Sequence, residues 1–323
     1  MKHTANPVAL FWLALVALLS VNQANADAAV IRWFQDAGQL SNIDEVLARE
    51  PDRWQSIGAG RGLNLGFSDS TYWIQVVVAP ESENQVLEIS YPLLDEVDLF
   101  WVLNGRVIRS YETGDARPFS NRPVDHRNFV FPVPSNTEPI TAYVRVKTQG
   151  AVQVPVEVET AAEFLAGEQL SYGWQTMFLG IIVALALYNL FLFAIIRQPT
   201  YLWYVLTVVL SGLVHLHFKG ILFQWLWPEL PGLNRYVTIP LTGLTMIAAL
   251  VFSLQFLAVS RYSKASYRFL QVLMVGAGIG IVIGAFGAYQ TAITLVAVLA
   301  AIATPAAWFI GIYVWSRGQR LAG

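Results

Sequence analysis

The stretch TMFLGIIVALALYNLFLFAII, residues 176–196, contains no charged side chain. About 20 consecutive apolar residues are needed to cross the ~30 Å hydrocarbon core of a bilayer. The stretch is therefore predicted to span a membrane, because a helix so uniformly apolar has no polar face to present to water. Four later stretches share this character. The five predicted spans are approximately residues 176–196, 201–218, 236–259, 269–288 and 292–315.

Charge divides the 323-residue chain at the start of this region. Residues 27–170 contain 21 Asp and Glu against 11 Lys and Arg, whereas residues 171–323 contain one acidic residue, Glu229, and eight basic ones. The division indicates water as the solvent of the first half and lipid as that of the second. The acidic first half disfavours nucleic acid and other polyanions as partners. The chain has no cysteine, which excludes disulfides and thiol chemistry.

The first 26 residues have the pattern of a secretory signal peptide. Lys2 precedes an apolar run at residues 8–21, and Ala24-Asn25-Ala26 supplies a small-residue cleavage site. An uncleaved membrane anchor is the alternative. The residues from Asp27 onward are therefore expected to start outside the cytoplasm.

Residues 27–165 are predicted to form a β-sandwich with a jelly-roll-like arrangement. Short stretches rich in β-branched and aromatic residues alternate with turn signals, and Asn104-Gly105 is a strong hairpin signal. Pro155 indicates an edge strand or a bulge within residues 152–159. One early helix is expected at residues 42–49, with Ser41 as its cap. A juxtamembrane linker, residues 166–175, then leads to the transmembrane bundle, residues 176–323.

The loops between the predicted spans agree with this orientation. With the β-sandwich outside, the inner loops and the tail hold six Lys and Arg residues, and the outer loops hold two. Cytoplasmic loops of membrane proteins carry such an excess of positive charge. The C-terminus is then cytoplasmic. Because the sequence ends after five spans, the membrane part is expected to be truncated, and any cytoplasmic module driven by the bundle would lie beyond Gly323.

The stretch GDARPFSNRPVDHRNFVFPV, residues 114–133, concentrates cations in the acidic half. One interpretation is a ligand site. The other is a structural element in which arginines pair with carboxylates and secure the fold, and we favour it. The candidate ligand-binding residues are Asp115, Arg117, Arg122 and Arg127, with Trp101 and Tyr91 as candidate stacking platforms.

Motifs for catalysis or cofactors are not found. The sequence lacks the phosphate-binding, dinucleotide-binding, zinc-protease and hydrolase patterns. We therefore expect no catalytic residues, no cofactor and no enzymatic activity in this chain. His215 and His217 are weak metal-ligand candidates, since side chains two positions apart point in different directions on a helix. Gly276 and Gly280 form a GxxxG pattern, which favours close helix packing and allows a homodimer contact.

These features together resemble one family, the bacterial seven-transmembrane receptors with diverse intracellular signalling modules (7TMR-DISM). In the membrane part the resemblance rests on LYNLFLFAIIRQPTYLWYVL, residues 187–206, and KGILFQWLWPELPGLN, residues 219–234. In the first half it rests on YWIQVVV, YPLLDEVDLFWV, GDARPFSNRP and RNFVFPV, in that order, which resemble the type 2 extracellular domain.

The resemblance implies a membrane signal-transduction receptor. In it, a periplasmic domain similar to a carbohydrate-binding module senses a small or sugar-like ligand. The bundle, in the bacterial inner membrane, relays the signal to a cytoplasmic output such as a diguanylate cyclase or histidine kinase. The alternative is a transporter or channel component with an exported accessory domain. It is disfavoured because ionisable residues, which mark transport pathways, are nearly absent from the predicted spans.

Overall fold

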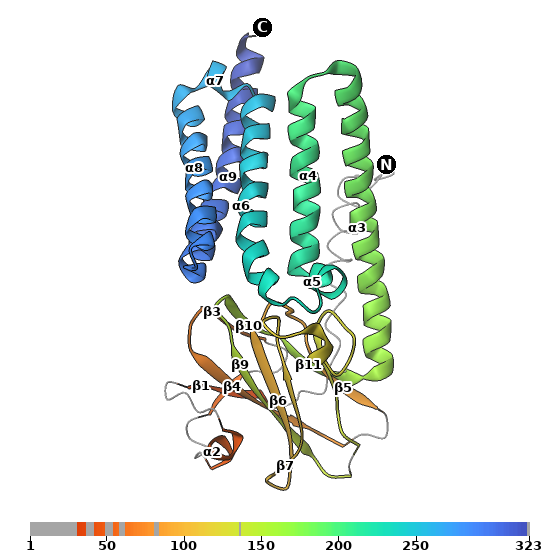
Figure 1. Cartoon of the computed structure of the whole chain (residues 1–323). Coiled ribbons are helices and arrows are strands. Elements are labelled where there is room, and N and C mark those ends of the chain that lie inside the picture. Colours follow the sequence, from red (N-terminus) through yellow and green to blue (C-terminus); the bar gives the residue numbers. More distant parts are fainter. Residues whose placement is uncertain are drawn as a thin grey trace, which may run out of the picture.

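The computed structural model describes residues 31–36, 42–48, 54–57, 62–80, 84–135 and 137–321. It consists of a strand-rich part, here called the β-domain, and a helical part, here called the bundle, which lie end to end (Figure 1). The predicted signal peptide, residues 1–26, lies outside the described residues.

The β-domain is built from three antiparallel sheets. The first has the strand order β2-β1-β4-β9-β6-β7, the second pairs β10 with β3, and the third has the order β11-β5-β8. The strands are β1 (Ile31–Asp36), β2 (Gln55–Ile57), β3 (Leu63–Phe67), β4 (Thr71–Val78), β5 (Gln85–Ile89), β6 (Glu96–Leu103), β7 (Arg106–Thr113), β8 (Phe129–Pro132), β9 (Ile140–Lys147), β10 (Ala151–Val154) and β11 (Val156–Thr160).

One apolar core lies between these sheets, so the predicted β-sandwich is confirmed. Strand β9 shows how the sequence builds it, because its buried and less buried residues alternate. Ala142, Val144 and Val146 are fully buried and meet Leu87 and Phe131 of the third sheet in one cluster. Alternation of this kind places every second side chain on the core face. The finer jelly-roll assignment stays a prediction.

Two local sequence signals act as predicted. Asn104 and Gly105, at φ 50° and 74°, join β6 to β7, and Leu103 lies opposite Arg106. This left-handed pair is the geometry that an Asn-Gly hairpin favours. Pro155 separates β10 from β11, which pair with different sheets, and β10 also contains an irregularity at Val152.

The early helix, α2 (Ile43–Leu47), begins one residue later than expected. Its cap is Asn42, whose side chain accepts a hydrogen bond from the Asp44 N–H at 3.0 Å. The expectation of Ser41 as the cap is therefore replaced, because Asn42 already fills that position. Ser41 lies outside the described residues.

The bundle contains five helices long and apolar enough to cross a membrane. They are α3 (Ala161–Ile196), α4 (Pro199–Phe218), α6 (Gly232–Phe256), α8 (Lys264–Ala285) and α9 (Tyr289–Leu321), with the short helices α5 (Ile221–Leu226) and α7 (Val259–Tyr262) between them. Helix α3 packs on α4, α4 on α6, and α6 on α8 and α9. Each predicted span overlaps one of the five, although the third extends past the end of α6 to Val259 and the fourth past the end of α8 to Ala288.

Helix α3 differs most from expectation. It has 36 residues and starts directly after β11, so residues 166–175, expected to be a linker, continue the helix. Thr160 and Glu163 form a capping box at its start, which satisfies free N–H groups of the first turn. The β-domain therefore joins the bundle through a helix and not through a separate linker.

The glycine-rich face of α8 is used inside the chain. A Cβ at Gly276 would lie 2.9 Å from Leu299, and one at Gly280 would lie 2.7 Å from Val296, both on α9. The predicted close helix packing is confirmed at these positions. Both glycines therefore make a contact within the chain, and the homodimer stays a prediction.

Candidate functional site at the domain junction

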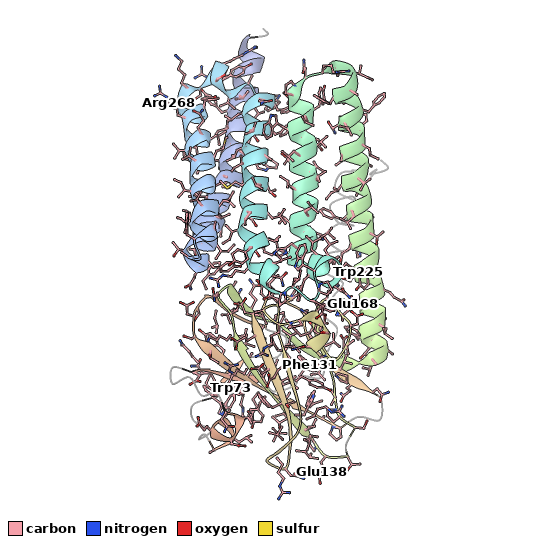
Figure 2. All side chains as sticks on the ribbon, viewed as in Figure 1. Trp73, Phe131, Glu138, Glu168, Trp225 and Arg268 are labelled. Atoms are coloured by element: carbon pink, nitrogen blue, oxygen red, sulfur yellow. The ribbon has the colours of Figure 1, made fainter. Side chains whose placement is uncertain are left out.

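The segment between β7 and β8, residues 114–128 and here called the arginine loop, faces the bundle. Its 3-10 turn η2 (Phe119–Asn121) meets the connection between α4 and α6: the Phe119 N–H donates to the Pro228 carbonyl at 2.8 Å. The Phe119 ring also packs edge-on against Phe223 of α5, with ring centroids 5.4 Å apart. Figures 1 and 2 show this boundary at the end of the bundle nearest the sheets. The sequence stretch that concentrates cations is thus a domain junction.

Gly114 fixes the entry to the loop. Its φ is +143°, and a Cβ there would lie 2.0 Å from the Asp95 carbonyl oxygen. A side chain cannot be accommodated at that distance, and L-residues rarely adopt this backbone conformation. The glycine allows the following N–H of Asp115 to donate to the Leu94 carbonyl at 2.8 Å, which holds the two segments together.

Arg117 secures the β-domain internally. Its guanidinium forms an ion pair with Asp98 and donates to the Thr113 carbonyl at 3.0 Å. Asp98 also accepts from Arg145 of β9 at 2.6 Å. Arg117 therefore matches the expected structural role, an arginine that pairs with a carboxylate of its own domain.

Arg122 has a different environment. It is buried and lies over the rings of Phe119 and Phe129, at 4.5 and 4.3 Å from their centroids. It donates to the carbonyl oxygens of His126 and Arg127 at 2.9 and 2.5 Å. Burial lowers the pKa of its guanidinium to about 10. The expected carboxylate pairing does not occur here, because aromatic faces and backbone carbonyls supply the negative potential instead.

Arg127 ties the loop to the bundle. Its Nη2 donates to both carboxylate oxygens of Glu168 on α3, at 2.9 and 3.1 Å, and to the Ser171 hydroxyl at 2.9 Å. The guanidinium also lies 4.9 Å from the Tyr172 ring centroid. Figure 2 labels Glu168 at this boundary. Arg127 is buried and its ionic partner is Glu168. This ion pair therefore links the β-domain directly to helix α3 of the bundle.

His126 adds a second bond to the same carboxylate. Its Nε2 lies 2.9 Å from a Glu168 oxygen, and its Nδ1 accepts from the Asn128 N–H at 3.2 Å. Since Nδ1 accepts a hydrogen bond, Nε2 carries the proton and donates it to Glu168. The tautomer is thus set by the backbone of the loop.

A cavity of about 460 Å³ lies on the other side of the junction. The β-domain contributes one wall and the ends of α6 and α9 the other. Its lining residues are Asp69, Leu93, Asp95, Glu96, Asp115, Ala116, Lys147, Thr148, Gln149, Gly150, Pro231, Gly232, Asn234, Arg235, Thr238 and Tyr289. Asn234 closes it by donating to the Asp115 carbonyl at 2.9 Å and accepting from the Trp227 indole at 2.7 Å. The volume is typical of small-molecule sites.

Two carboxyl groups share this cavity wall. Asp115 is 7% exposed and lies within hydrogen-bonding reach of the Asp95 carboxyl. Burial, and then the charge of Asp95, raise the pKa of Asp115 well above its usual range. The same two groups, after burial, raise the pKa of the nearby Tyr91 to about 12.

The remaining candidate residues from the sequence lie in different environments. Trp101 has no exposed surface and lies in the β-domain core, so it offers no stacking platform. Tyr91 is half-buried against the same core. His217 is buried and bonds to Thr238 of α6 at 2.8 Å, whereas the His215 ring packs on Phe178 of α3. The two histidines therefore face different helices and do not converge on one metal position.

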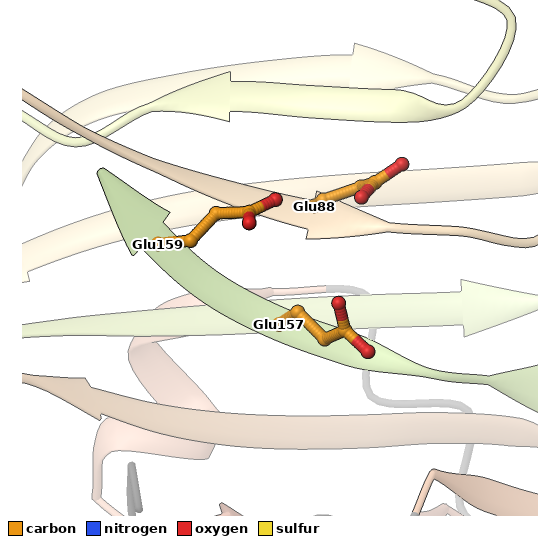
Figure 3. Close-up of side chains that lie close together, drawn as sticks. All are labelled: Glu88, Glu157 and Glu159. Carbon is orange, nitrogen blue, oxygen red and sulfur yellow. The ribbon is translucent and has the colours of Figure 1, made fainter. Parts of the chain in front are cut away.

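One acidic cluster lies away from the junction. Glu88 of β5 and Glu157 and Glu159 of β11 offer carboxylate atoms within 4.8 Å of one another (Figure 3). Among the described residues, this is the group whose spacing would suit a metal ion. The innermost member is already partnered, because Asn128 donates to Glu88 at 2.5 Å. Burial and the neighbouring Glu88 raise the pKa of Glu159 to about 7.

Sequence reasoning missed three junction residues, Asp95, Glu168 and Asn234. Asp95 and Asn234 lie within the stretches that carry the family resemblance, but an isolated polar residue carries no signal of what it faces. Glu168 carries a weak one, since it is the last acidic residue before the first long apolar run.

The fold and the junction define a class: a multi-pass membrane protein whose strand-rich N-terminal domain is docked on its membrane helices. Two family models then match. The model described as 7TMR-DISM extracellular 2 matches residues 28–160, and the model described as 7TM diverse intracellular signalling matches residues 171–323. The chain belongs to the 7TMR-DISM family, whose domains are of the sensor and receptor type. The β-domain is therefore its extracellular part. A search of curated proteins finds no match.

Proposed function

We propose that this receptor-like protein senses a small or sugar-like ligand with its β-domain and relays binding through the bundle to a cytoplasmic output module. In this proposal it lies in the bacterial inner membrane, with the β-domain in the periplasm and the C-terminus in the cytoplasm. The positive charge of the predicted inner loops supports that orientation.

One observation carries the proposal: the arginine loop contacts three separate helices of the bundle. Arg127 bonds to α3, Phe119 packs on α5, and the Asp115 carbonyl accepts from Asn234 of α6. A ligand that shifts this loop must also shift the helix ends, because buried polar contacts are costly to break. The shift is limited by the difference in the ligand's affinity for the two arrangements.

Distance measurements across the membrane test this relay. The chain has no cysteine, so a pair of introduced cysteines can carry spin labels without background. One label replaces exposed Glu112 on β7, and the other replaces exposed Gln198 between α3 and α4. Small sugars, amino acids and amines are added to the full chain in lipid nanodiscs.

A ligand that binds and changes the label-to-label distance supports the receptor function. A ligand that binds without changing any distance, or that is transported into sealed vesicles, contradicts it and favours the transporter alternative.

A further inference from the structure

We propose that the junction cavity is the ligand site and that it binds a small organic cation with a primary ammonium group, held by Asp95 and Asp115. The proposal rests on the receptor function above and adds the position of the site and the chemistry of its ligand. Neither family description assigns either one.

The position follows from the way the cavity is built. Asp95 and Asp115 come from the β-domain, whereas Asn234, Thr238 and Tyr289 come from the bundle. A ligand there contacts both parts at once, so its affinity depends on how they are docked. Coupling between a ligand and a domain arrangement requires such a difference in contacts.

The expected charge of the ligand follows from the charged side chains that line the cavity and from the bonds they already make. Four carboxyl groups line the cavity, from Asp69, Asp95, Glu96 and Asp115, against the two cations of Lys147 and Arg235. Some of these charges are already paired or satisfied. Glu96 bonds to Arg145 at 3.1 Å, and Arg235 donates to the Gly287 carbonyl at 2.9 Å.

Lys147 lines the same cavity, but no basic group of the described residues bonds to the carboxyl pair Asp95 and Asp115. Asp95 accepts one hydrogen bond, from the Gln149 N–H at 2.6 Å. In the described part of the chain, the Asp115 carboxyl has Asp95 as its side-chain hydrogen-bond partner and no basic group bonded to it. A buried carboxylate without a cation is costly. An ammonium group supplies that charge together with three donors.

Other ligand classes fit this wall less well. An anion would be repelled by the carboxyl pair. A sugar normally stacks on an aromatic face, and the Tyr289 ring has the Arg235 guanidinium 5.8 Å from its centroid. A metal ion prefers three or more converging ligands, and the group with that spacing in the described residues is the Glu88 cluster and not this one.

Protons should be linked to this binding. The pKa of Asp115 is raised, so the group holds a proton over a range where an ordinary carboxyl has lost it. A bound ammonium favours the ionised form, so binding displaces the proton and strengthens as pH rises through that pKa. The charged or titratable groups facing Asp115 from the surrounding elements are Asp69, Tyr91, Asp95, Glu96, Arg122, Lys147, Arg235 and Tyr289.

Calorimetry on the full chain in nanodiscs tests the proposal. The probes are ethanolamine, putrescine and agmatine, with 1,4-butanediol as an uncharged match for putrescine and calcium chloride as the metal control. Nanodiscs are made from phosphatidylcholine and phosphatidylglycerol. We expect at least one amine to bind and butanediol not to bind. We also expect up to one proton to be released, measured by comparing buffers of different ionisation enthalpy.

A variant pair locates the site. Asp115→Asn keeps the shape and can donate to Asp95, and it should weaken amine binding at least about tenfold and abolish the proton release. Asp125→Asn makes the same change on the same loop, at an exposed residue outside the cavity, and should leave binding unchanged. A thermal melt confirms that both variants are folded.

The proposal is overturned if no amine binds, if butanediol binds as well as putrescine, if calcium displaces the amine, or if Asp115→Asn binds normally. A sugar or amino acid that changes the label distance in the same protein would then leave the receptor function standing. Phosphatidylethanolamine carries the same ammonium group. If nanodiscs containing it block amine binding in the wild type, the headgroup is the source of the ligand; if they do not, the ligand is a free amine.

Discussion

The two sides of the domain junction differ in how their charges are satisfied. On the α3 side, the imidazole of His126 and the guanidinium of Arg127 both bond to Glu168, and each oxygen of that carboxylate accepts at least one hydrogen bond. On the α6 side, the acids Asp95 and Asp115 lie next to each other in the wall of the cavity, and no cation of the described residues is bonded to either of them. The same loop supplies Asp115 to one side and Arg127 to the other.

This difference assigns separate tasks to the two sides. A satisfied buried pair resists separation, because breaking it leaves an uncompensated charge. An unsatisfied pair gains free energy when a suitable charge arrives. The α3 side is therefore suited to hold the domains together, and the α6 side to respond.

The largest expected effect comes from straining the backbone at the start of the arginine loop, which supplies residues to both sides of the junction. Gly114→Ala places a Cβ against the Asp95 carbonyl in a strained conformation, and it should destabilise the β-domain by more than about 3 kcal/mol. Thermal unfolding measures this. Gly105→Ala is the control, since it also has a positive φ but nothing within 4 Å. Equal losses in the two variants would show that strain, and not the clash, dominates.

The second largest effect is expected from removing the ion pair between Arg127 and Glu168 on the α3 side alone. Arg127→Met leaves Glu168 without its arginine and should cost about 3 kcal/mol, as the loss of one partner of a buried pair does. Arg117→Met should cost less, because its partner Asp98 keeps Arg145. Hydrogen exchange should rise in the first turns of α3 only in the Arg127 variant. A larger cost for Arg117→Met would reverse the assignment of the two arginines.

A smaller effect is expected from removing the hydrogen bonds of Asn234 on the α6 side of the junction. Asn234→Ala leaves the Trp227 indole and the Asp115 carbonyl without partners, which should cost about 2 kcal/mol. Hydrogen exchange should rise in the connection between α5 and α6. Asn189→Ala is the control, because Asn189 is only partly buried and bonds to the Leu185 carbonyl of its own helix. Protection in α3 should be unaffected by either change.

The smallest effect is expected at Glu159, which belongs to the Glu88 cluster and does not line the junction cavity. The pKa of Glu159 is raised to about 7 from its ordinary 4.5, so the folded state binds the proton more tightly than the unfolded state. The stability is present below pH 4.5 and is lost as pH rises through about 7. Glu159→Gln should remove part of that fall, by less than about 1 kcal/mol because the group is half-exposed. Melting temperatures at pH 5 and pH 8 measure it, and an unchanged pH dependence would contradict the assignment.

The sequence predicted the elements well where the signal is local. Residues 176–196 specify a span by composition alone, Asn104-Gly105 specifies a hairpin, and the alternation around Val144 specifies a buried face. These features depend on neighbouring residues in the chain, which a sequence displays directly.

The junction could be predicted only in part, because its partners are distant in the chain. Arg117 and Asp98 are 19 residues apart, and their pairing follows from charge. Asp115 and Asn234 are 119 residues apart, and nothing in either residue type indicates the other. Arg122 shows the opposite failure, since its charge suggested a carboxylate and the fold supplied aromatic rings.

The unbroken run of helix α3 from the last strand into the membrane gives the protein a lever. At 1.5 Å per residue its 36 residues measure about 54 Å. A tilt of about 5° imposed at the junction would then displace the far end by about 5 Å. Glu168 lies near the N-terminal end of α3, about which such a tilt would occur. A small movement of the arginine loop would therefore produce a larger displacement at the other end of the helix, where the chain passes from α3 to α4.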